Sequence, residues 1–253
     1  MGIERAEAFF GGRAFEAHRH DTYAIGITTR GVQMFRYRGA MRLGLPGQLH
    51  FLHPDEVHDG FSGTVEGFGY RILYVEPWLV QASLGGCRLP FVPEPVQNPA
   101  PPTAALAALL AGIDEPTDAL WRADAAVTIA DALSAAAGDA EAAVQVDLKA
   151  VSAVREHLAA DPAQATRADV LERIGGIDRW TIARQFRAAF GTSPVRYRTM
   201  RRLALARAEI ASGASLVDAA ATAGFADQSH MTRHFKRAYG LTPGRWAAVT
   251  SGQ

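Results

Sequence analysis

Arginine and aromatic side chains recur in the C-terminal half of the chain at an offset of 49 residues. Arg184 and Arg233 hold equivalent places in this repeat, and an arginine can fork to the two acceptors of a guanine edge. Gln228 suits adenine, and the Trp180 ring can cover a thymine methyl group. The chemistry of this set is DNA binding, by contacts to bases or to phosphates, and its members are Arg179, Trp180, Thr181, Arg184, Arg187, Gln228, Ser229, His230, Arg233 and Lys236.

Some of these residues also have a structural interpretation. Arg184 and Arg233 could form salt bridges within the protein, and His230 fits either role. Trp180 on an exposed helix face has little structural use, so we favour a functional role for it. Contacts to phosphate hold a protein in register without reading sequence, and we expect them from Arg187, Lys236, Arg196, Arg198, Arg201 and Arg245.

Three histidines in the N-terminal half form a second candidate site. His18 and His20 alternate, so a strand would place both rings on one face. His58 from a neighbouring strand would complete a set of three, which either binds a metal ion or lines a polar pocket. We favour the pocket and assign no metal or other cofactor. With Tyr23, which also fits a core position, the three are the candidate residues for binding a small molecule. His50 and His53 are expected outside or at the rim.

The repeat predicts two helices that carry the candidate base contacts. Asp178 and Asp227 can cap the starts of these helices, because their carboxylates accept hydrogen bonds from the first free amide groups. Gly191 and Gly240 can adopt the left-handed conformation that ends them. Apolar residues at helical spacing between caps and ends are expected to pack in the core, namely Ile182, Phe186, Phe190, Met231, Phe235 and Tyr239.

A short helix is predicted before each repeated helix. The two cover Ala168 to Ile174 and Leu216 to Ala223, and each ends in a tight turn with glycine. A short helix, a tight turn and a capped helix make a helix-turn-helix motif, and the chain contains this arrangement twice. Ser193-Pro194 and Thr242-Pro243 start a further helix after each motif, because proline is favoured at the first helical position.

The first 95 residues have the pattern of an antiparallel β domain. Short apolar runs such as Tyr23 to Ile27 and Tyr70 to Val75 alternate with turn signals, which favours a sandwich or a barrel. Residues 91–102 contain five prolines and form a connector. After it, Thr103 can cap a short helix and Asp118 to Ala137 forms a longer one, with Gly112 and Pro116 between them. Gly138 and Asp139 mark the next break.

Composition agrees with two globular domains in 253 residues and excludes a disordered chain. A single cysteine excludes a disulfide scaffold and fits a reducing cytoplasm. No signal peptide or membrane helix is apparent, so we expect a cytoplasmic protein. The net charge of zero hides an asymmetry, because residues 144–253 carry +7 and residues 1–143 carry −7. A basic half suggests contact with a polyanion.

The segment from Gly224 to Arg237, followed by Gly240-Leu241-Thr242-Pro243, resembles the second-motif signature of the AraC/XylS family of bacterial transcription factors. Arg184 to Arg187 with Gly191 to Pro194 is similar to the first motif. Glu172 departs from the family, which usually has a small alanine there. The helix from Pro194 to Ser212 resembles the rod that joins the two motifs.

The N-terminal half is similar to the effector-binding cupin barrel of the same family over Phe15 to Tyr23 and Pro54 to Gly60. In that resemblance, His18, His20 and His58 stand where a metal-binding cupin keeps three histidines. The carboxylate expected four or five residues after the second histidine is missing, because Ala24 and Ile25 occupy those positions. This absence disfavours a metal site.

The prediction is a two-domain α+β protein: a cupin-like barrel (1–100), a helix pair for dimerisation (101–143) and an all-α double helix-turn-helix domain (144–253). The protein is predicted to be a non-enzymatic transcription regulator that responds to a small-molecule effector bound in the N-terminal domain. The family resemblance implies double-stranded DNA and a second copy of the chain as partners, with RNA polymerase as a further candidate, and no membrane. The alternatives are a metal-dependent cupin enzyme with an accessory helical domain and an architectural DNA binder without effector.

Overall fold

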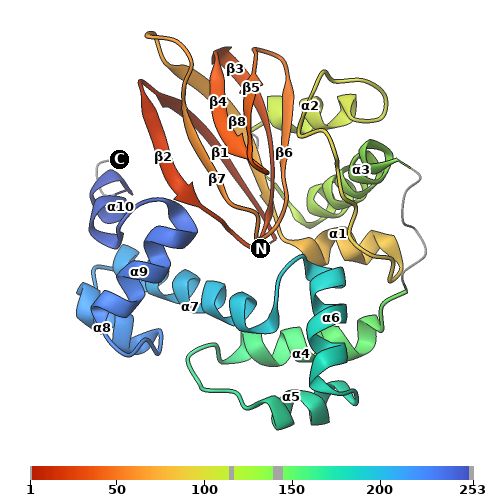
Figure 1. Ribbon diagram of the computed structural model, residues 1–253, viewed down its shortest axis with the longest axis vertical. Coiled ribbons are helices and arrows are strands. Elements are labelled where there is room, and N and C mark those ends of the chain that lie inside the picture. Colours follow the sequence, from red (N-terminus) through yellow and green to blue (C-terminus); the bar gives the residue numbers. More distant parts are fainter. Residues whose placement is uncertain (1, 114–116, 139–144, 251–253) are drawn as a thin grey trace.

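The computed structural model describes residues 2–113, 117–138 and 145–250 and shows two parts that lie against each other (Figure 1). The N-terminal part consists of β-strands with a few helices at one side. The C-terminal part consists of helices alone among the residues described there. This two-part α+β architecture confirms the predicted fold class.

The strands form two antiparallel sheets with the orders β1-β8-β3-β6-β9 and β2-β7-β4-β5. The first sheet contains β1 (Ile3–Phe10), β3 (Tyr23–Gly31), β6 (Leu49–Leu52), β8 (Phe68–Val75) and β9 (Val96–Gln97). The second contains β2 (Arg13–His18), β4 (Gln33–Tyr37), β5 (Ala40–Gly44) and β7 (His58–Ser62). The two sheets face each other as in a cupin, but they do not close into one continuous barrel.

The first sheet is covered on both faces, which explains the unbroken apolar run at the start of β3. One face packs against the second sheet through a core that includes Phe35, Phe68 and Tyr70. The other face packs against helices through Leu73, Leu106 and other apolar side chains. A strand buried on both sides reads as a continuous apolar segment rather than an alternating one.

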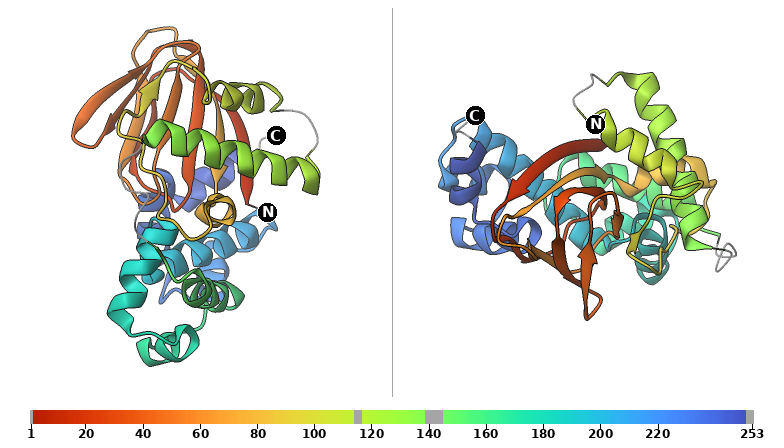
Figure 2. Two further views of the ribbon diagram at one scale, coloured as in Figure 1. Left: turned by 90° about the vertical axis from the view of Figure 1, so that its right-hand side faces the viewer. Right: turned by 90° about the horizontal axis from the view of Figure 1, so that it is seen from above.

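Two helices lie over the outer face of the first sheet, α2 (Ala104–Ala111) and α3 (Ala119–Ala137), and α1 (Pro77–Leu84) lies at the end of the sheet, between α3 and α6 (Arg179–Phe190) (Figure 2). The helix predicted from Asp118 is confirmed, and the Asp118 carboxylate accepts a hydrogen bond from the Trp121 amide at 2.7 Å. The prediction missed α1, which falls inside the region read as strands. Pro77 starts this helix and Gly85 ends it in the left-handed conformation.

The C-terminal part contains α4 (Leu148–Ala160), α5 (Ala168–Gly175), α6 (Arg179–Phe190), α7 (Pro194–Ala211), α8 (Leu216–Thr222), α9 (Gln228–Tyr239) and α10 (Pro243–Thr250). Both repeated helices begin and end as predicted. Asp178 and Asp227 accept hydrogen bonds from first-turn amides, while Gly191 and Gly240 have φ angles of 69° and 70°. The two helix-turn-helix motifs are therefore α5-α6 and α8-α9, joined by α7.

Each motif has its own aromatic core, as the helical spacing predicted. In the first, Phe186 packs edge-on against Phe190 and Tyr197. In the second, Phe235 packs against Tyr239 and Trp246. Phe186 and Phe235 are completely buried. The cores are separate clusters, so each motif is stabilised by its own contacts.

The predicted domain limits at residues 100 and 143 remain predictions. The first falls between β9 and α2, where the chain changes from strand to helix. The second lies outside the described residues, as do Asp139 and Pro116.

Candidate functional site

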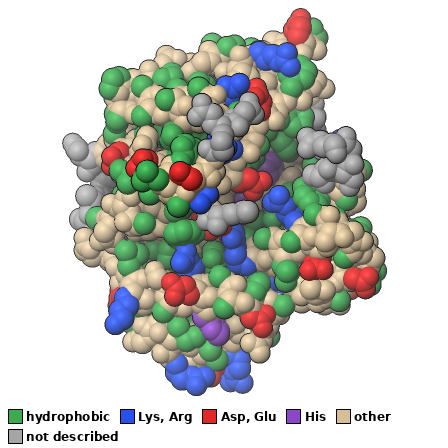
Figure 3. Space-filling view, turned by 180° about the vertical axis from the view of Figure 1, so that it is seen from behind, with side chains coloured by type: hydrophobic (Ala, Val, Ile, Leu, Met, Phe, Trp, Pro, Cys, Tyr) green, Lys and Arg blue, Asp and Glu red, His purple; other side chains and the backbone are tan. Residues whose placement is uncertain are grey.

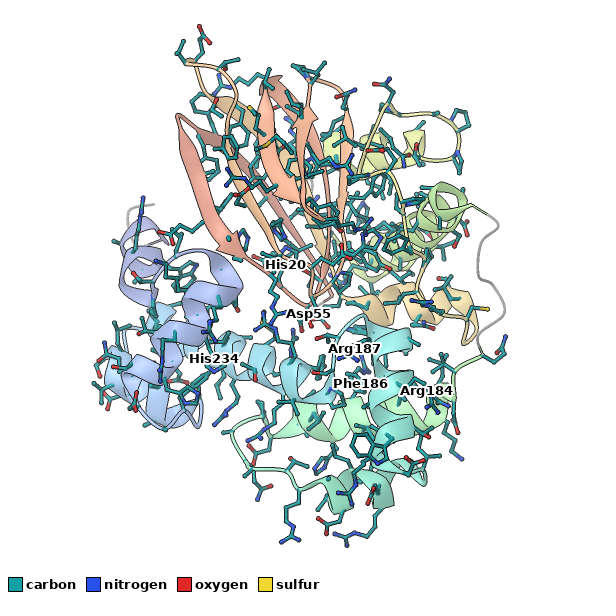
Figure 4. The ribbon with its side chains drawn as sticks, viewed as in Figure 1. His20, Asp55, Arg184, Phe186, Arg187 and His234 are labelled. Atoms are coloured by element: carbon teal, nitrogen blue, oxygen red, sulfur yellow. The ribbon has the colours of Figure 1, made fainter. Side chains whose placement is uncertain are left out.

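The candidate base-reading edge of α6 is open to solvent. Trp180 is 76% exposed, and Arg184 and Arg187 are exposed on the same face. The Arg184 guanidinium donates a hydrogen bond to the Thr181 hydroxyl at 3.2 Å, which holds it along the helix. In Figure 4, Arg184 lies away from the β domain, whereas the C-terminal end of α6 points toward it. This arrangement leaves the first turns of α6 free for a partner.

Arg179 is held by a neighbouring carboxylate. Glu172 on α5 accepts hydrogen bonds from the Arg179 amide at 3.0 Å and from its guanidinium at 2.8 Å. The hydrogen bonds from Arg179 lower the pKa of Glu172. Glu172 thus points across the turn toward α6, not into the motif core, and the departure from the family pattern leaves the packing intact.

The corresponding edge of α9 is also open. Gln228, Ser229 and Arg233 are exposed. His230 is half-buried, and its Nε2 lies 3.1 Å from Nε2 of His234, one turn further along. Among the residues that the structure describes, neither Arg184 nor Arg233 forms an ion pair, so the salt-bridge interpretation of these two arginines has no support.

Several residues expected to contact phosphate instead face the N-terminal part. Lys236 lies 2.8 Å from the Glu16 carboxylate. Arg201 contacts two carboxylates of the β domain, and Arg196 contacts a third. Arg198 donates to the carbonyl of Pro162 within the C-terminal part. In this arrangement those side chains hold the two parts, or α7, in place, which differs from the expectation.

The contact between the two parts is built from ion pairs. The Arg201 guanidinium lies 2.9 Å from Asp21 and 3.0 Å from Glu76. Asp55 lies 3.3 Å from Arg196, and its second oxygen accepts a hydrogen bond from the Thr192 hydroxyl at 3.2 Å. Asp21 is only 5% exposed. Because buried carboxylates need charged partners, these contacts fix how the C-terminal part is held.

Both C-terminal glycines of the repeated helices lie directly against the β domain. A Cβ atom on Gly191 would stand 2.7 Å from Pro54, and one on Gly240 would stand 3.1 Å from the Glu16 carbonyl and 3.2 Å from His18 Nδ1. The Arg19 amide also donates to the carbonyl of Arg237 at 3.0 Å. The β domain therefore contacts the ends of α6 and α9 that are opposite to their exposed first turns.

The histidine cluster lies inside the β domain, next to this contact. One ring nitrogen of each of His18, His20 and His58 lies within 4.8 Å of the others, and all three residues are buried. They line a cavity of about 30 Å³ between the two sheets, together with His50, Tyr70, Tyr74 and other side chains. The structure therefore brings together the three histidines that the sequence predicted as a set.

The imidazoles of this cluster are neutral at pH 7. Burial lowers the pKa of His18 and His58, and it lowers that of His20 to about 3. A backbone hydrogen bond at Nδ1 opposes this effect at each ring but does not outweigh the burial. Neutral imidazoles keep one ring nitrogen with a free lone pair.

Comparison with known proteins identifies the architecture. A family model for an AraC-like ligand binding domain matches residues 1–133, more than half of the chain, and a helix-turn-helix domain model matches residues 171–248. The chain belongs to the AraC family. It is a DNA-binding transcription regulator with a ligand-binding N-terminal domain, as the sequence predicted.

Relatives of this AraC-family chain are regulators as well. It is 27% identical to YbfI, an uncharacterized HTH-type transcriptional regulator of Bacillus subtilis, over 86% of this chain and 81% of that protein. It is 34% identical to the HTH-type transcriptional regulator RipA of Corynebacterium glutamicum over 40% of this chain and 30% of that protein. The structure of ToxT from Vibrio cholerae shares the fold, with a TM-score of 0.67, 10% identity and 98% coverage of both chains.

Two histidine predictions for the AraC-family domain were wrong. His50 and His53 were expected outside or at a rim, but they are 1% and 5% exposed. His50 faces the cavity, and neither of its ring nitrogens has a hydrogen-bond partner in the described structure. His53 is hydrogen-bonded to the Tyr37 hydroxyl and the Val92 amide. Burial lowers their pKa values to about 4 and about 3.

The expectation that Tyr23 binds the small molecule needs correction. Ala24 faces the cavity, so alternation along β3 turns Tyr23 to the opposite, helix-covered face of the sheet. Its hydroxyl donates a hydrogen bond to the Pro90 carbonyl at 2.9 Å, and its ring packs beside His53. Tyr23 is a core residue.

Basic side chains are distributed over two regions of this regulator. On the face drawn in Figure 3, Lys and Arg gather at the foot of the C-terminal part and along the junction of the two parts, with acidic groups between them.

No helix among the described residues is long and apolar enough to span a bilayer.

Proposed function

We propose that this AraC-family protein controls transcription as a cytoplasmic homodimer, without catalysis, by changing how its β domain holds the two helix-turn-helix motifs when a ligand binds. The observation that carries the proposal is the position of the cavity histidines. His18 and His20 alternate along the chain with Arg19 and Asp21, which contact the C-terminal part. A shift of His18 or His20 when a ligand binds in the cavity would therefore move the adjacent residues that contact the C-terminal part.

The DNA contacts that we propose lie on the exposed first turns of α6 and α9. Trp180 and Arg184 on one helix and Gln228, Ser229 and Arg233 on the other project from the ends that the β domain leaves free. A helix of a helix-turn-helix motif enters the major groove with its N-terminal residues at the base edges. Arg187 would contact phosphate, since it is exposed one turn further on.

Dimerisation through α3 is a further part of the proposal. Leu120 and Val127 are 70% and 50% exposed on this helix and lie two turns apart on one face. Exposed apolar residues at this spacing favour contact with a second helix. The segments 1–100, 101–143 and 144–253 would then serve ligand binding, dimerisation and DNA binding, and RNA polymerase would be a further partner of the bound dimer.

The proposal is tested by selecting duplexes from a randomised library with the full-length protein and measuring affinity by fluorescence anisotropy. We expect a conserved sequence in which each chain reads two short elements about one helical turn apart, one for each of its motifs, and binding that weakens steeply as salt rises. A selected pool without any common sequence would contradict the proposal. Equal affinity for selected and scrambled duplexes would contradict it as well.

A further inference from the structure

The three cavity histidines share one hydrogen-bonding arrangement. Nδ1 of His18 lies 2.7 Å from the Glu16 carbonyl oxygen, Nδ1 of His20 lies 3.0 Å from that of Thr22, and Nδ1 of His58 lies 3.0 Å from that of Glu56. A carbonyl only accepts, so each Nδ1 carries the proton, and at His20 the Thr22 hydroxyl oxygen, also 3.0 Å from Nδ1, is a second acceptor. Each Nε2 then keeps its lone pair. Metal-binding histidines are oriented in this way by a hydrogen bond at the second ring nitrogen.

One of these three lone pairs is buried without a partner in the described structure. Nε2 of His20 is buried and has no hydrogen-bond partner, and His20 is only 8% exposed. The rings of His18 and His20 lie with centroids 4.4 Å and 4.9 Å from that of His58. A buried acceptor without a partner costs free energy, which an additional ligand would recover.

The size of the cavity restricts the ligand. At about 30 Å³, it is far smaller than the roughly 300–1,000 Å³ of sites for organic molecules. It is sufficient for an ion and a water molecule, since one water occupies about 10–15 Å³ by this measure. Apolar side chains such as Phe35, Phe68 and Ile72 fill the rest of the interior.

We infer that His18, His20 and His58 bind a divalent transition-metal ion through their Nε2 atoms, and that this ion is the effector of the regulator. The identification of the effector rests on the proposed function; the binding site does not. Neutral imidazole suits zinc, nickel, cobalt, copper and iron, and three histidines with an open position for water are a known zinc arrangement. The nitrogen atoms, now within 4.8 Å, would close to about 3.3 Å around a tetrahedral ion.

The site is placed to act on the DNA-binding part. The His18 ring lies against Gly240 at the end of α9, and the carbonyl of His20 accepts a hydrogen bond from the Asp55 amide at 2.7 Å. Asp55 in turn contacts Arg196 of α7. Drawing the three rings together moves the segment that contacts both α7 and α9, so metal binding and DNA binding are coupled.

Metal binding is tested on the full-length protein after removal of metals with a chelator and dialysis. Calorimetric titration with ZnCl₂ and CoCl₂ should show one ion per chain, and bound Co²⁺ should give the visible absorption of a nitrogen-coordinated site. His18→Gln with His58→Gln should lower the affinity by at least about 100-fold, the upper end of the loss caused by removing a supporting residue. Circular dichroism of the metal-free variant shows whether it is folded.

The matched control for this titration is His230→Gln with His234→Gln, because these residues form the other close histidine pair, at 3.1 Å. This control should retain the ion. Equal binding by wild type and the His18/His58 variant, or loss only in the control, would overturn the site. A wild-type protein that gives no Co²⁺ absorption would overturn it too.

The effector role is tested by measuring affinity for the selected duplex with and without 1 equivalent of Zn²⁺. We expect a change of about 5- to 150-fold in the wild type, the range of ordinary allosteric coupling, and none in the His18/His58 variant. A bound ion without an effect on DNA affinity would overturn the effector assignment. Failure of the proposed function is distinguishable, since it would abolish sequence-specific DNA binding with and without metal.

Discussion

Arg184 and Arg233 offer the sharpest test at the scale of single residues, because they occupy equivalent exposed positions on α6 and α9. Arg184→Ala and Arg233→Ala should each weaken binding to the selected duplex by about 1–3 kcal/mol and relax the preference at one or two base pairs. Anisotropy against single-base variants of the duplex measures both effects.

The control for these variants is Arg30→Ala, which removes an exposed arginine at the far end of the β domain, where it stacks on Phe9. Its DNA affinity should equal that of the wild type. If Arg233→Ala loses the same affinity for scrambled as for selected DNA, Arg233 contacts phosphate alone.

Glu172 places a carboxylate beside the candidate DNA-binding edge, in contact with Arg179. Glu172→Gln removes this negative charge but can still accept the hydrogen bond from the Arg179 amide. We therefore expect affinity for DNA to rise several-fold at low salt, with the difference fading as salt screens the charge. Unchanged or weaker binding across a salt series would place Glu172 away from the DNA backbone.

Residue positions were predictable where spacing alone decides them. His18 and His58 meet because they are paired in register on β2 and β7, and His20 joins them two residues later, just beyond the end of β2. The sides on which His50 and Tyr23 lie were not predictable. The alternation of side chains along a strand shows which residues share a face of the sheet. It does not show which face packs against the second sheet, because that depends on how the two sheets stack.

At the scale of elements, the repeat predicted both helix-turn-helix motifs because caps, glycines and prolines are local signals. Helix α1 was missed although Pro77 and Gly85 mark its ends, since the apolar residues between them also fit a strand. No local signal shows that α1 lies against α6, because that contact forms only when the two parts meet.

Phe235 tests the independence of the second motif. Phe235→Ala should cost about 3–5 kcal/mol, as expected for a fully buried aromatic residue, and should unfold α8-α9. Hydrogen exchange should show lost protection in α9 with α6 still protected, because the two cores are separate clusters. Trp180→Ala, at an exposed site, should change stability by no more than about 0.5 kcal/mol. Equal loss of protection in both motifs would show that they fold as one unit.

At the scale of the whole molecule, the charge asymmetry has two causes rather than one. The sequence suggested that the basic half meets DNA, but Arg196, Arg201 and Lys236 pair with acidic residues of the other half. Part of the asymmetry therefore serves the contact between the two parts. Charge counts cannot separate the two causes, because they carry no information on which residues face each other.

Arg201 tests this contact. Arg201→Ala leaves Asp21 buried without a partner, which costs up to about 3–5 kcal/mol, less where solvent reaches the site. We expect the wild type to unfold in one calorimetric transition and the variant in two, and we expect the variant to have a larger radius of gyration in solution scattering. Arg36→Ala, which removes an exposed arginine paired with Asp59 within the β domain, should do neither. An unchanged radius would show that the ion pairs do not hold the two parts.

Substitutions on the exposed face of α3 test the proposed dimer. Val127→Glu places a charge on that face and should convert the dimer to a monomer in sedimentation velocity. Val65→Glu makes the same change at a 96% exposed loop position and should leave the dimer intact. A Val127→Glu protein that still sediments as a dimer would place the interface elsewhere.

Gly191 and Gly240 contact the same β domain, and this affects how α6 and α9 align along the duplex. Successive major grooves face the same way only once per turn, about 34 Å. Because the β domain contacts the C-terminal ends of both helices, it fixes the orientation of α6 relative to α9. A small rotation of the β domain would move both helices away from the spacing of successive major grooves. Regulation would then change the alignment of the two helices with the DNA grooves. DNA binding would be lost although no side chain that contacts a base has changed.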